Sequence, residues 1–186
     1  MPRYIAFLRA INVGGHTVKM DVLRSLFESI GFTDVETFIA SGNVIFETKS
    51  KATTKLERDI ERCLHKALGF EVATFLRTDS EVAAISQYRP FPDAMLKAAI
   101  ALNIGFVSTP FDREAEATLK GLRTAIDEFH SNGREVYWLC RKRQSESGFS
   151  GAVFEKALGI RVTFRGINTV VKLAAKYSPL IAKSQD

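Results

Sequence analysis

Along the chain, hydrophobic positions recur with the spacing of a β-strand in some segments and of an α-helix in others. The order of these segments predicts the fold of the first half. Strand-like apolar runs lie at 3–8, 34–40, 44–46 and 70–77, and helix-like stripes lie at 19–30 and 54–68. Taken in order, these segments give βαββαβ, which is the ferredoxin-like arrangement. A short predicted helix at 79–87 and a proline-containing linker follow.

The second half repeats this order. Strand-like runs lie at 100–107, 126–130, 135–140 and 161–164, and helix-like stripes lie at 113–122, 151–158 and 168–177. A local match of Lys66-Ala67-Leu68-Gly69 with Lys156-Ala157-Leu158-Gly159 falls at the ends of corresponding helices. The match and the shared order favour an internal duplication over a chance similarity.

Turn and cap residues support these boundaries. Asn132-Gly133, between two apolar runs, is a strong hairpin signal. Thr54 followed by Glu57 predicts a capping box at the start of the second helix, and Ser150 predicts an N-cap.

Several strands are apolar on both faces, as in Tyr4, Ile5, Phe7 and Leu8. The helices of a ferredoxin-like half cover only one face of its sheet, so the other face needs a further cover. We therefore predict an α+β protein of two tandem ferredoxin-like (βαββαβ) halves packed as one compact unit, with an extra C-terminal helix. The predicted parts are half 1 at 3–78, a helix and linker at 79–99, half 2 at 100–164, and a C-terminal helix packed on the body at 165–178.

Composition and charge narrow the class of protein. The chain has 186 residues, of which 46% are hydrophobic and 25% are charged, as in an ordinary globular protein. Its net charge of +5 can favour an anionic partner, although a mildly basic, well-solvated surface is the more ordinary interpretation. Arg141-Lys142-Arg143 is the local cluster of cations.

Targeting signals, apolar runs and cysteines indicate the cellular compartment of the protein. The N-terminus enters a strand without a signal peptide, and no apolar run reaches the roughly 20 residues of a membrane span. Cys63 lies on a helical stripe and Cys140 on a strand, so we predict two buried, reduced thiols. We expect a cytoplasmic protein without membrane contact, and the sequence does not indicate its oligomeric state.

The most site-like stretch is Arg9-Ala10-Ile11-Asn12-Val13-Gly14-Gly15, between a strand and a helix. A glycine loop before a helix N-terminus favours the approach of an anion to backbone N–H groups. The alternatives are a structural salt bridge for Arg9 and a turn that requires positive φ at the glycines. The stretch is neither a Gly-x-Gly-x-x-Gly fingerprint nor a P-loop, which argues against a dinucleotide or Walker-type site.

Three further stretches place polar residues at the ends of elements. Ser41-Gly42-Asn43 predicts a hairpin turn, Ser150 follows the basic cluster, and residues 165–172 open the last helix. Capping or an ordinary loop is the alternative role at each of them. We expect these candidate ligand-binding residues to gather in a cleft between the halves: Arg9, Asn12, Gly14, Gly15, Ser41, Asn43, Ser150, Arg165, Asn168 and Lys172.

Neither a metal nor a cofactor is predicted, because His16, His65 and His130 lack the spacing of metal ligands. No nucleophile or acid–base set can be assembled from the sequence. The sequence therefore leaves open whether the protein is an enzyme.

The motifs Arg-x-Ile-Asn-Val-Gly-Gly at 9–15 and Ser-Gly-Asn-Val at 41–44, with Asn168, Thr169 and Lys172, resemble a bacterial family, domain-of-unknown-function family 1697. The resemblance spans about residues 3–177 and implies two ferredoxin-like halves, with no established activity. Family members usually have Arg-Asn-Trp-Asn-Thr-Val near the C-terminus, where this chain has Gly166 and Ile167 in place of Asn and Trp. A ligand site that used those two residues would differ here.

Two hypotheses about function follow. The first, which we prefer, is binding of a small anionic ligand that is phosphate- or nucleotide-like. The second is a nucleic-acid or protein adaptor that uses the basic loop at 141–143. The third predicted strand lacks the aromatic pattern of RNA-recognition domains, which argues against RNA binding of that type.

Overall fold

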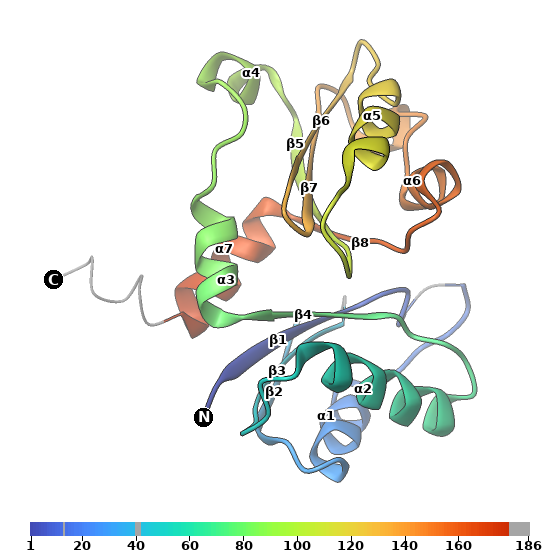
Figure 1. Cartoon of the computed structure of the whole chain (residues 1–186), viewed down its shortest axis with the longest axis vertical. Coiled ribbons are helices and arrows are strands. Elements are labelled where there is room, and N and C mark those ends of the chain that lie inside the picture. The colour runs from blue at the N-terminus through green and yellow to red at the C-terminus, as the bar shows by residue number, and fades with distance from the viewer. Residues whose placement is uncertain (13, 40–41, 179–186) are drawn as a thin grey trace, which may run out of the picture. The chain divides into compact units, whose positions relative to one another are not determined.

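The computed structural model describes residues 1–12, 14–39 and 42–178. The chain divides into two units, residues 1–84 with 173–186 (unit 1) and residues 85–172 (unit 2). The predicted halves 3–78 and 100–164 fall within units 1 and 2, respectively. Each unit contains one four-stranded antiparallel sheet (Figure 1).

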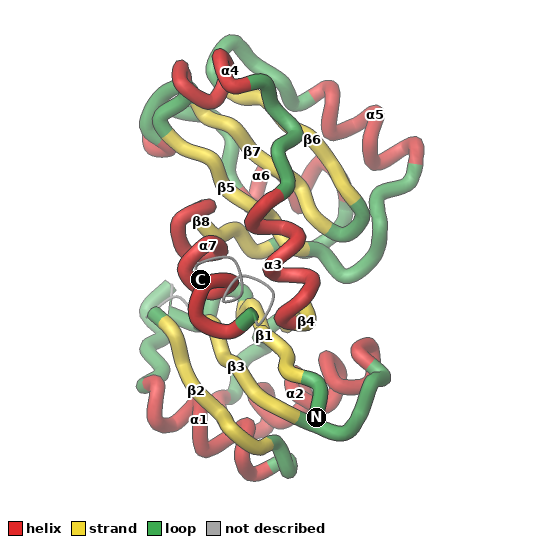
Figure 2. The backbone as a smooth tube through the Cα atoms, turned by 90° about the vertical axis from the view of Figure 1, so that its left-hand side faces the viewer, coloured by secondary structure: helices red, strands yellow, loops and turns green. Residues whose placement is uncertain are grey.

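Unit 1 follows the predicted order of elements. Its sheet has the strand order β2-β3-β1-β4, which is visible in Figure 2. The elements are β1 (Arg3–Leu8), α1 (Met20–Ser29), β2 (Thr33–Phe38), β3 (Asn43–Glu47), α2 (Thr53–Leu68) and β4 (Thr74–Thr78). The boundary with unit 2 falls within α3 (Asp79–Gln87) and α7 (Ile167–Tyr177).

Unit 2 has the equivalent strand order, β6-β7-β5-β8. Its elements are α4 (Asp93–Ala98), β5 (Ala101–Phe106), α5 (Arg113–Gly121), β6 (Asp127–Asn132), β7 (Glu135–Cys140), the 3₁₀ helix η1 (Gln144–Glu146), α6 (Gly151–Leu158) and β8 (Thr163–Gly166). The predicted α+β class with two βαββαβ halves is confirmed. Helix α4 lies within the segment that was predicted to be a linker.

Alternating side chains of β1 explain the core of unit 1. Tyr4, Ala6 and Leu8 pack with apolar residues of α1 and α2, which lie on one face of the sheet in Figure 1. Ile5 and Phe7 point to the opposite face and are 0% exposed. The strand is therefore buried on both faces, as its sequence predicts.

On that opposite face, the end of α7 is attached to unit 1 by polar and aromatic contacts. The Tyr177 hydroxyl donates to Glu36 Oε2 at 2.7 Å, and its ring lies edge-on to Phe38 at 6.1 Å. Next along the chain, Ser178 Oγ donates to the carbonyl oxygen of Asp79 at 2.6 Å. Tyr177 and Ser178 thereby join the C-terminal end of α7 to β2 and to the start of α3.

Unit 2 has the same division between the two faces of its sheet. Trp138 packs on the helical side, where the centroid of its ring lies 4.7 Å from that of Phe149 and 5.7 Å from that of Phe164. Tyr137 points to the other side, lies 5.2 Å from the Tyr88 ring, and donates its hydroxyl to the Ile85 carbonyl at 3.5 Å. Burial raises the pKa of Tyr137 above the ordinary range, so this donor stays protonated.

The predicted capping box at Thr54 and Glu57 is wrong. Helix α2 begins at Thr53 after Ala52, without a side-chain hydrogen bond at its N-cap. Glu57 turns instead toward the sheet, where its Oε1 accepts the Leu76 N–H at 2.9 Å, and Glu61 accepts the Thr74 N–H at 2.9 Å. Strand β4 is an edge strand, so α2 occupies two donors that could otherwise pair with another chain.

Strand β4 is also shorter than predicted, because residues 70–73 are a loop and pairing with β1 begins at Thr74. The helix stops are as predicted: Gly69 and Gly159 end α2 and α6 in the left-handed region, with φ of 81° and 68°. These two C-caps belong to the Lys-Ala-Leu-Gly match that indicated the duplication.

A buried carboxylate organises the turn-rich segment between β7 and α6. Asp127 is 0% exposed and accepts the Trp138 Nε1–H at 2.8 Å. It also accepts the hydroxyls of Ser147 and Thr124, each at 2.8 Å. Since Ser147 in turn accepts the Phe149 N–H at 2.9 Å, the carboxylate fixes this segment from inside the core.

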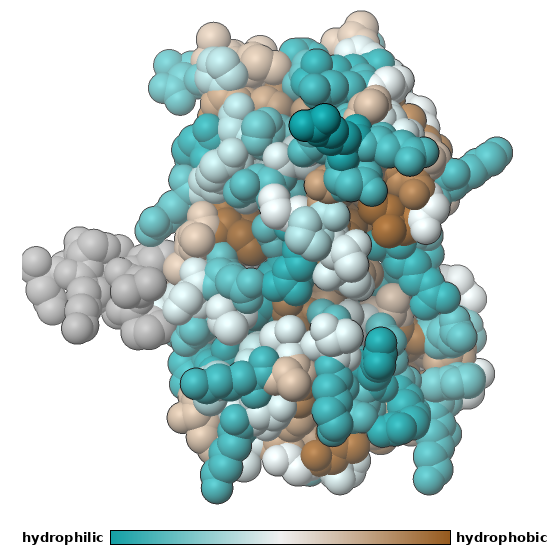
Figure 3. Space-filling view, in the orientation of Figure 1, coloured by the Kyte–Doolittle hydropathy of each residue, from teal (hydrophilic) through white to brown (hydrophobic). Residues whose placement is uncertain are grey.

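Hydrophilic residues cover most of the face drawn in Figure 3, with smaller hydrophobic patches between them. Among the larger apolar side chains that are exposed, Ile100 is 65% and Ile39 is 48% accessible.

Replacing Asp127 with alanine should destabilise the protein by about 2–4 kcal/mol, because the buried indole N–H of Trp138 and the hydroxyls of Ser147 and Thr124 lose their acceptor. Asp59→Ala is the matched control, since Asp59 makes partly exposed ion pairs on α2 and its loss should cost less than about 1 kcal/mol. Denaturant unfolding followed by the fluorescence of Trp138, the one tryptophan of the chain, measures both. Equal losses for the two variants would contradict the role given to Asp127.

Candidate functional site

The structure brings two of the predicted motifs together at one end of the unit 1 sheet. The Leu8 N–H donates to the Gly42 carbonyl at 2.9 Å, and the Arg9 N–H donates to the Ala73 carbonyl at 2.9 Å. Residues 9–12, 14–15 and 42–43 therefore form one continuous feature, which we call the motif end. Ser41 lies outside the described residues.

Gly42 shows how closely the two motifs pack. Its φ is 81°, and a Cβ at this position would lie 2.4 Å from Ile11 Cγ2 and 3.2 Å from Leu8 Cβ. Only glycine suits both the backbone conformation and the available space. Ile11 is itself 1% exposed, so the loop after β1 is held against the β2–β3 turn by a buried side chain.

The two asparagines of the motif end have structural hydrogen bonds. Asn12 Oδ1 accepts the Val18 N–H at 2.7 Å, which closes the loop ahead of α1. Asn43 is 0% exposed, and its Nδ2 donates to the Phe38 carbonyl at 2.8 Å across the hairpin turn. Both amides thus hold the backbone of the motif end in place.

The backbone of the motif end repeatedly adopts the left-handed region. Gly14 and Gly15 have φ of 64° and 85°, with no heavy atom within 4 Å of where a Cβ would be. Ala10 and Ile39 also have positive φ, at 56° and 62°. Positive φ is rare for alanine and exceptional for a β-branched residue, so the backbone here is strained.

His16 and Phe70 are neighbours of the motif end that the sequence analysis did not select. Their rings stack at a centroid distance of 4.0 Å and an interplanar angle of 25°. The contact attaches the glycine loop to the segment after α2. The sequence carries no signal for it, because 54 positions separate two unremarkable residues.

The remaining candidates belong to unit 2, and Ser150 acts there as the predicted N-cap. Its hydroxyl accepts the Val153 N–H at 3.3 Å. Phe149, the preceding residue, is 6% exposed and lies 4.5 Å from the Phe129 ring. With Ser147 bound to Asp127, the stretch 147–151 is anchored to the core, and capping, the alternative role of Ser150, is present.

Arg165 is a buried cation on β8. It is 7% exposed, and its Nη1 donates to Thr163 Oγ1 at 2.8 Å and to the Phe164 carbonyl at 2.9 Å. Burial lowers the pKa of Arg165 to about 10, so it keeps its charge at neutral pH. Phe164 packs on the helical face beside α6, so Arg165 and Ser150 are on opposite faces of this sheet.

Arg77 is the counterpart of Arg165 in unit 1 and was missed by the sequence analysis. It is 0% exposed, and its Nη1 donates to the carbonyl of the preceding residue, Leu76, at 2.8 Å. Arg77 pairs with Ile5 of β1, as Arg165 pairs with Ile104 of β5. Strands β4 and β8, which correspond in the two units, thus each carry a buried arginine at the equivalent register.

Asn168 and Lys172 lie on the exposed side of α7, one turn apart. The helix follows β8 directly and begins at Ile167, so neither Asn168 nor Thr169 is its N-cap. In the basic cluster, Arg141 donates through Nη1 to the Ala125 carbonyl at 3.3 Å, and Lys142 and Arg143 are exposed. The shared cleft that was expected to unite these residues with the motif end stays a prediction.

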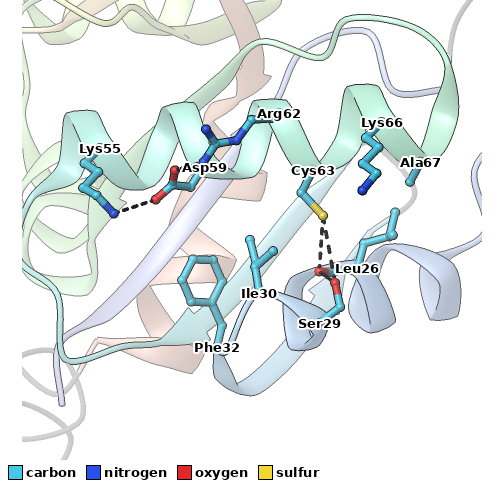
Figure 4. Close-up of a pocket in the computed structure, with 10 residues that line it drawn as sticks. All are labelled: Leu26, Ser29, Ile30, Phe32, Lys55, Asp59, Arg62, Cys63, Lys66 and Ala67. Atoms are coloured by element: carbon cyan, nitrogen blue, oxygen red, sulfur yellow. Dashed lines mark hydrogen bonds and ion pairs between the residues drawn. The ribbon is translucent and has the colours of Figure 1, made fainter.

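A groove of about 780 Å³ lies between α1 and α2 in unit 1 (Figure 4). Its lining is Leu26, Ser29, Ile30, Phe32, Lys55, Asp59, Arg62, Cys63, Lys66 and Ala67. We call it the α1–α2 groove. Cys63 lines it and is half-buried, so the prediction that both cysteines are buried holds for Cys140 alone.

Among the described residues, no cluster of three or more His, Cys, Asp or Glu side chains is arranged to hold a metal ion. None of their helices is long and apolar enough to cross a membrane.

Two ferredoxin-like units in tandem, with the motif end on the first, define the class of protein. The chain belongs to DUF1697, a family described as protein of unknown function, which matches residues 1–137. The match includes the whole motif end. It stops before residues 165–170, where this chain departs from the pattern expected for the family.

One solved structure is similar over almost its whole length. It is the conserved bacterial protein SP0830 from Streptococcus pneumoniae, 22% identical, covering 95% of this chain and 99% of that chain with a TM-score of 0.73. At this identity the likeness shows the fold alone. No curated protein matches the chain.

The packing at Gly42 predicts an unequal effect of two glycine substitutions. Gly69 has the same φ of 81° but no heavy atom within 4 Å of where a Cβ would lie, so Gly69→Ala should cost only the left-handed strain of roughly 1–2 kcal/mol. Gly42→Ala should cost a further 1–3 kcal/mol or so, because the methyl group overlaps Ile11. Chemical denaturation measures both, and equal losses would show that the two motifs are not in close contact.

Proposed function

We propose that this protein binds a small anionic, phosphate- or nucleotide-like ligand at the motif end of unit 1. The observation that carries the proposal is the left-handed backbone around the point where the two family motifs meet: it is strained at Ala10 and at Ile39, just after β2, and glycine supplies it at Gly14, Gly15 and Gly42. Strained backbone persists only where surrounding contacts hold it, and it clusters at ligand-binding sites. Successive backbone amides in such loops form concavities that attract anions.

The charge of the loop between β1 and α1 favours an anionic ligand over a cationic one. From Arg9 to Lys19 the sequence contains two permanent cations, Arg9 and Lys19, and no carboxylate. Lys19 is exposed at the N-cap of α1 and makes no side-chain cap hydrogen bond. The positive end of the α1 dipole adds to the same potential.

The support from Asn12 and Asn43 is indirect. Their amides hold the loop and the turn through Val18 and Phe38, so both residues position the backbone that would meet the ligand. Gly14 and Gly15 leave that backbone open to solvent. A contribution from Ser150, Arg165, Asn168 and Lys172 stays a prediction.

Thermal-shift measurements with inorganic phosphate, ribose 5-phosphate and a nucleoside monophosphate test the proposal, with ribose as the neutral control. A ligand that binds the folded state raises Tm by mass action, and each kcal/mol gained is worth roughly 2–4 °C for a chain of this size. We expect a saturable rise with at least one phosphate compound and none with ribose.

Arg9→Gln should abolish most of that rise. Arg113→Gln is the matched control, because Arg113 is an exposed arginine after the equivalent strand of unit 2. Each variant is compared with its own ligand-free Tm, so a change in basal stability does not affect the reading. A rise that is unchanged in Arg9→Gln, or no rise with any phosphate compound, would refute the proposal.

A further inference from the structure

The α1–α2 groove has the dimensions of a small-molecule site and is separate from the motif end. Its volume of about 780 Å³ lies within the range of roughly 300–1,000 Å³ that ligand pockets occupy. Its lining runs along α2 from Lys55 to Lys66, three turns of helix or roughly 16 Å. This inference goes beyond the proposed function and does not depend on it.

The floor of the groove is apolar. Leu26 of α1 and Ile30, the residue that caps α1, are partly exposed and pack against the core cluster of unit 1, and Phe32 is 8% exposed beneath them. In Figure 4, Ile30 and Phe32 point from α1 and the segment after it toward α2. An apolar group of a ligand could therefore extend the contact surface of the core.

The rim of the groove is basic. Three cations, Lys55, Arg62 and Lys66, line it together with one carboxylate, Asp59. Asp59 already accepts from Lys55 at 3.0 Å and from Arg62 at 2.6 Å. Within the described part of the chain, Lys66 has no carboxylate or hydrogen-bonding partner, so its charge is available at one end of the groove.

We propose that the α1–α2 groove binds an amphipathic anion, such as a medium-chain carboxylate. The apolar chain would lie on Leu26, Ile30 and Phe32, and the charged head would meet Lys66 and Arg62. A neutral or cationic molecule with the same chain lacks the charge complementarity that the three cations provide. Charge sign therefore separates this ligand class from general hydrophobic adsorption.

Cys63 provides a direct readout of occupancy. Its thiol lies in the groove, 3.7 Å from the Leu26 carbonyl and 4.0 Å from Ser29 Oγ (Figure 4). Cys140 is 0% exposed, and burial raises the pKa of its thiol, so it is unreactive in the folded protein. The rate of Cys63 modification by iodoacetamide, a neutral reagent, thus reports whether the groove is filled.

The experiment measures this rate in the full chain with decanoate, decanol or decyltrimethylammonium, each below the concentration at which it forms micelles. We expect decanoate to slow the modification in a saturable way, and the other two compounds to have a clearly weaker effect. Acetate, which has the head group without the chain, should give no protection.

Lys66→Gln should weaken protection by decanoate about threefold, as expected for an exposed charge contact. Lys156→Gln is the matched control, because Lys156 is the equivalent lysine of the duplicated Lys-Ala-Leu-Gly segment in α6. Ile30→Ser should weaken protection independently by removing part of the apolar floor.

Three results would overturn the proposal. They are no protection by decanoate, equal protection by all three compounds with a ten-carbon chain, or equal affinities in Lys66→Gln and Lys156→Gln. Phosphate compounds that raise Tm without protecting Cys63 would support the motif end alone, so the two proposals fail separately.

Discussion

The structure depends on one constraint, which is that each sheet contains a central strand, β1 in unit 1 and β7 in unit 2, that is buried on both faces. The helices between strands bury one face, as α1 and α2 do for Tyr4, Ala6 and Leu8. Ile5 and Phe7 on the other face are just as buried, so further elements must cover them. In unit 1, Tyr177 and Ser178 attach the end of α7 to β2 and α3, and in unit 2, Tyr88 packs on Tyr137.

The same constraint determines what happens at the end of β1. The strand is hydrogen-bonded on both sides up to its last residues, so the loop that follows leaves from a fixed point between Gly42 and Ala73. Ile11 then fills the space above Gly42, and Asn12 closes the loop onto Val18. Strained residues such as Ala10 and Ile39 can persist there because these contacts hold the surrounding backbone.

The two units share a frame but differ in what they carry. Both have the same strand order, a left-handed glycine after the second helix, and a buried arginine at the equivalent register. The double-glycine loop and the α1–α2 groove belong to unit 1, whereas unit 2 has the Asp127 network and the anchored loop at 147–151. The two units thus share the packing of their sheets and differ in their loops and helix faces.

The sequence by itself determined the order of elements, the helix stops at Gly69 and Gly159, the N-cap at Ser150 and the hairpin at Gly133, because these depend on local periodicity and backbone preference. Tertiary structure decided the rest. Glu57 matched a capping pattern, but its carboxylate accepts a hydrogen bond from the Leu76 N–H of β4 instead. Cys63 matched the apolar stripe of a helix, but it lines a groove. The contacts of Gly42 with Ile11 and of His16 with Phe70 join residues far apart in the chain, and only folding brings such residues together.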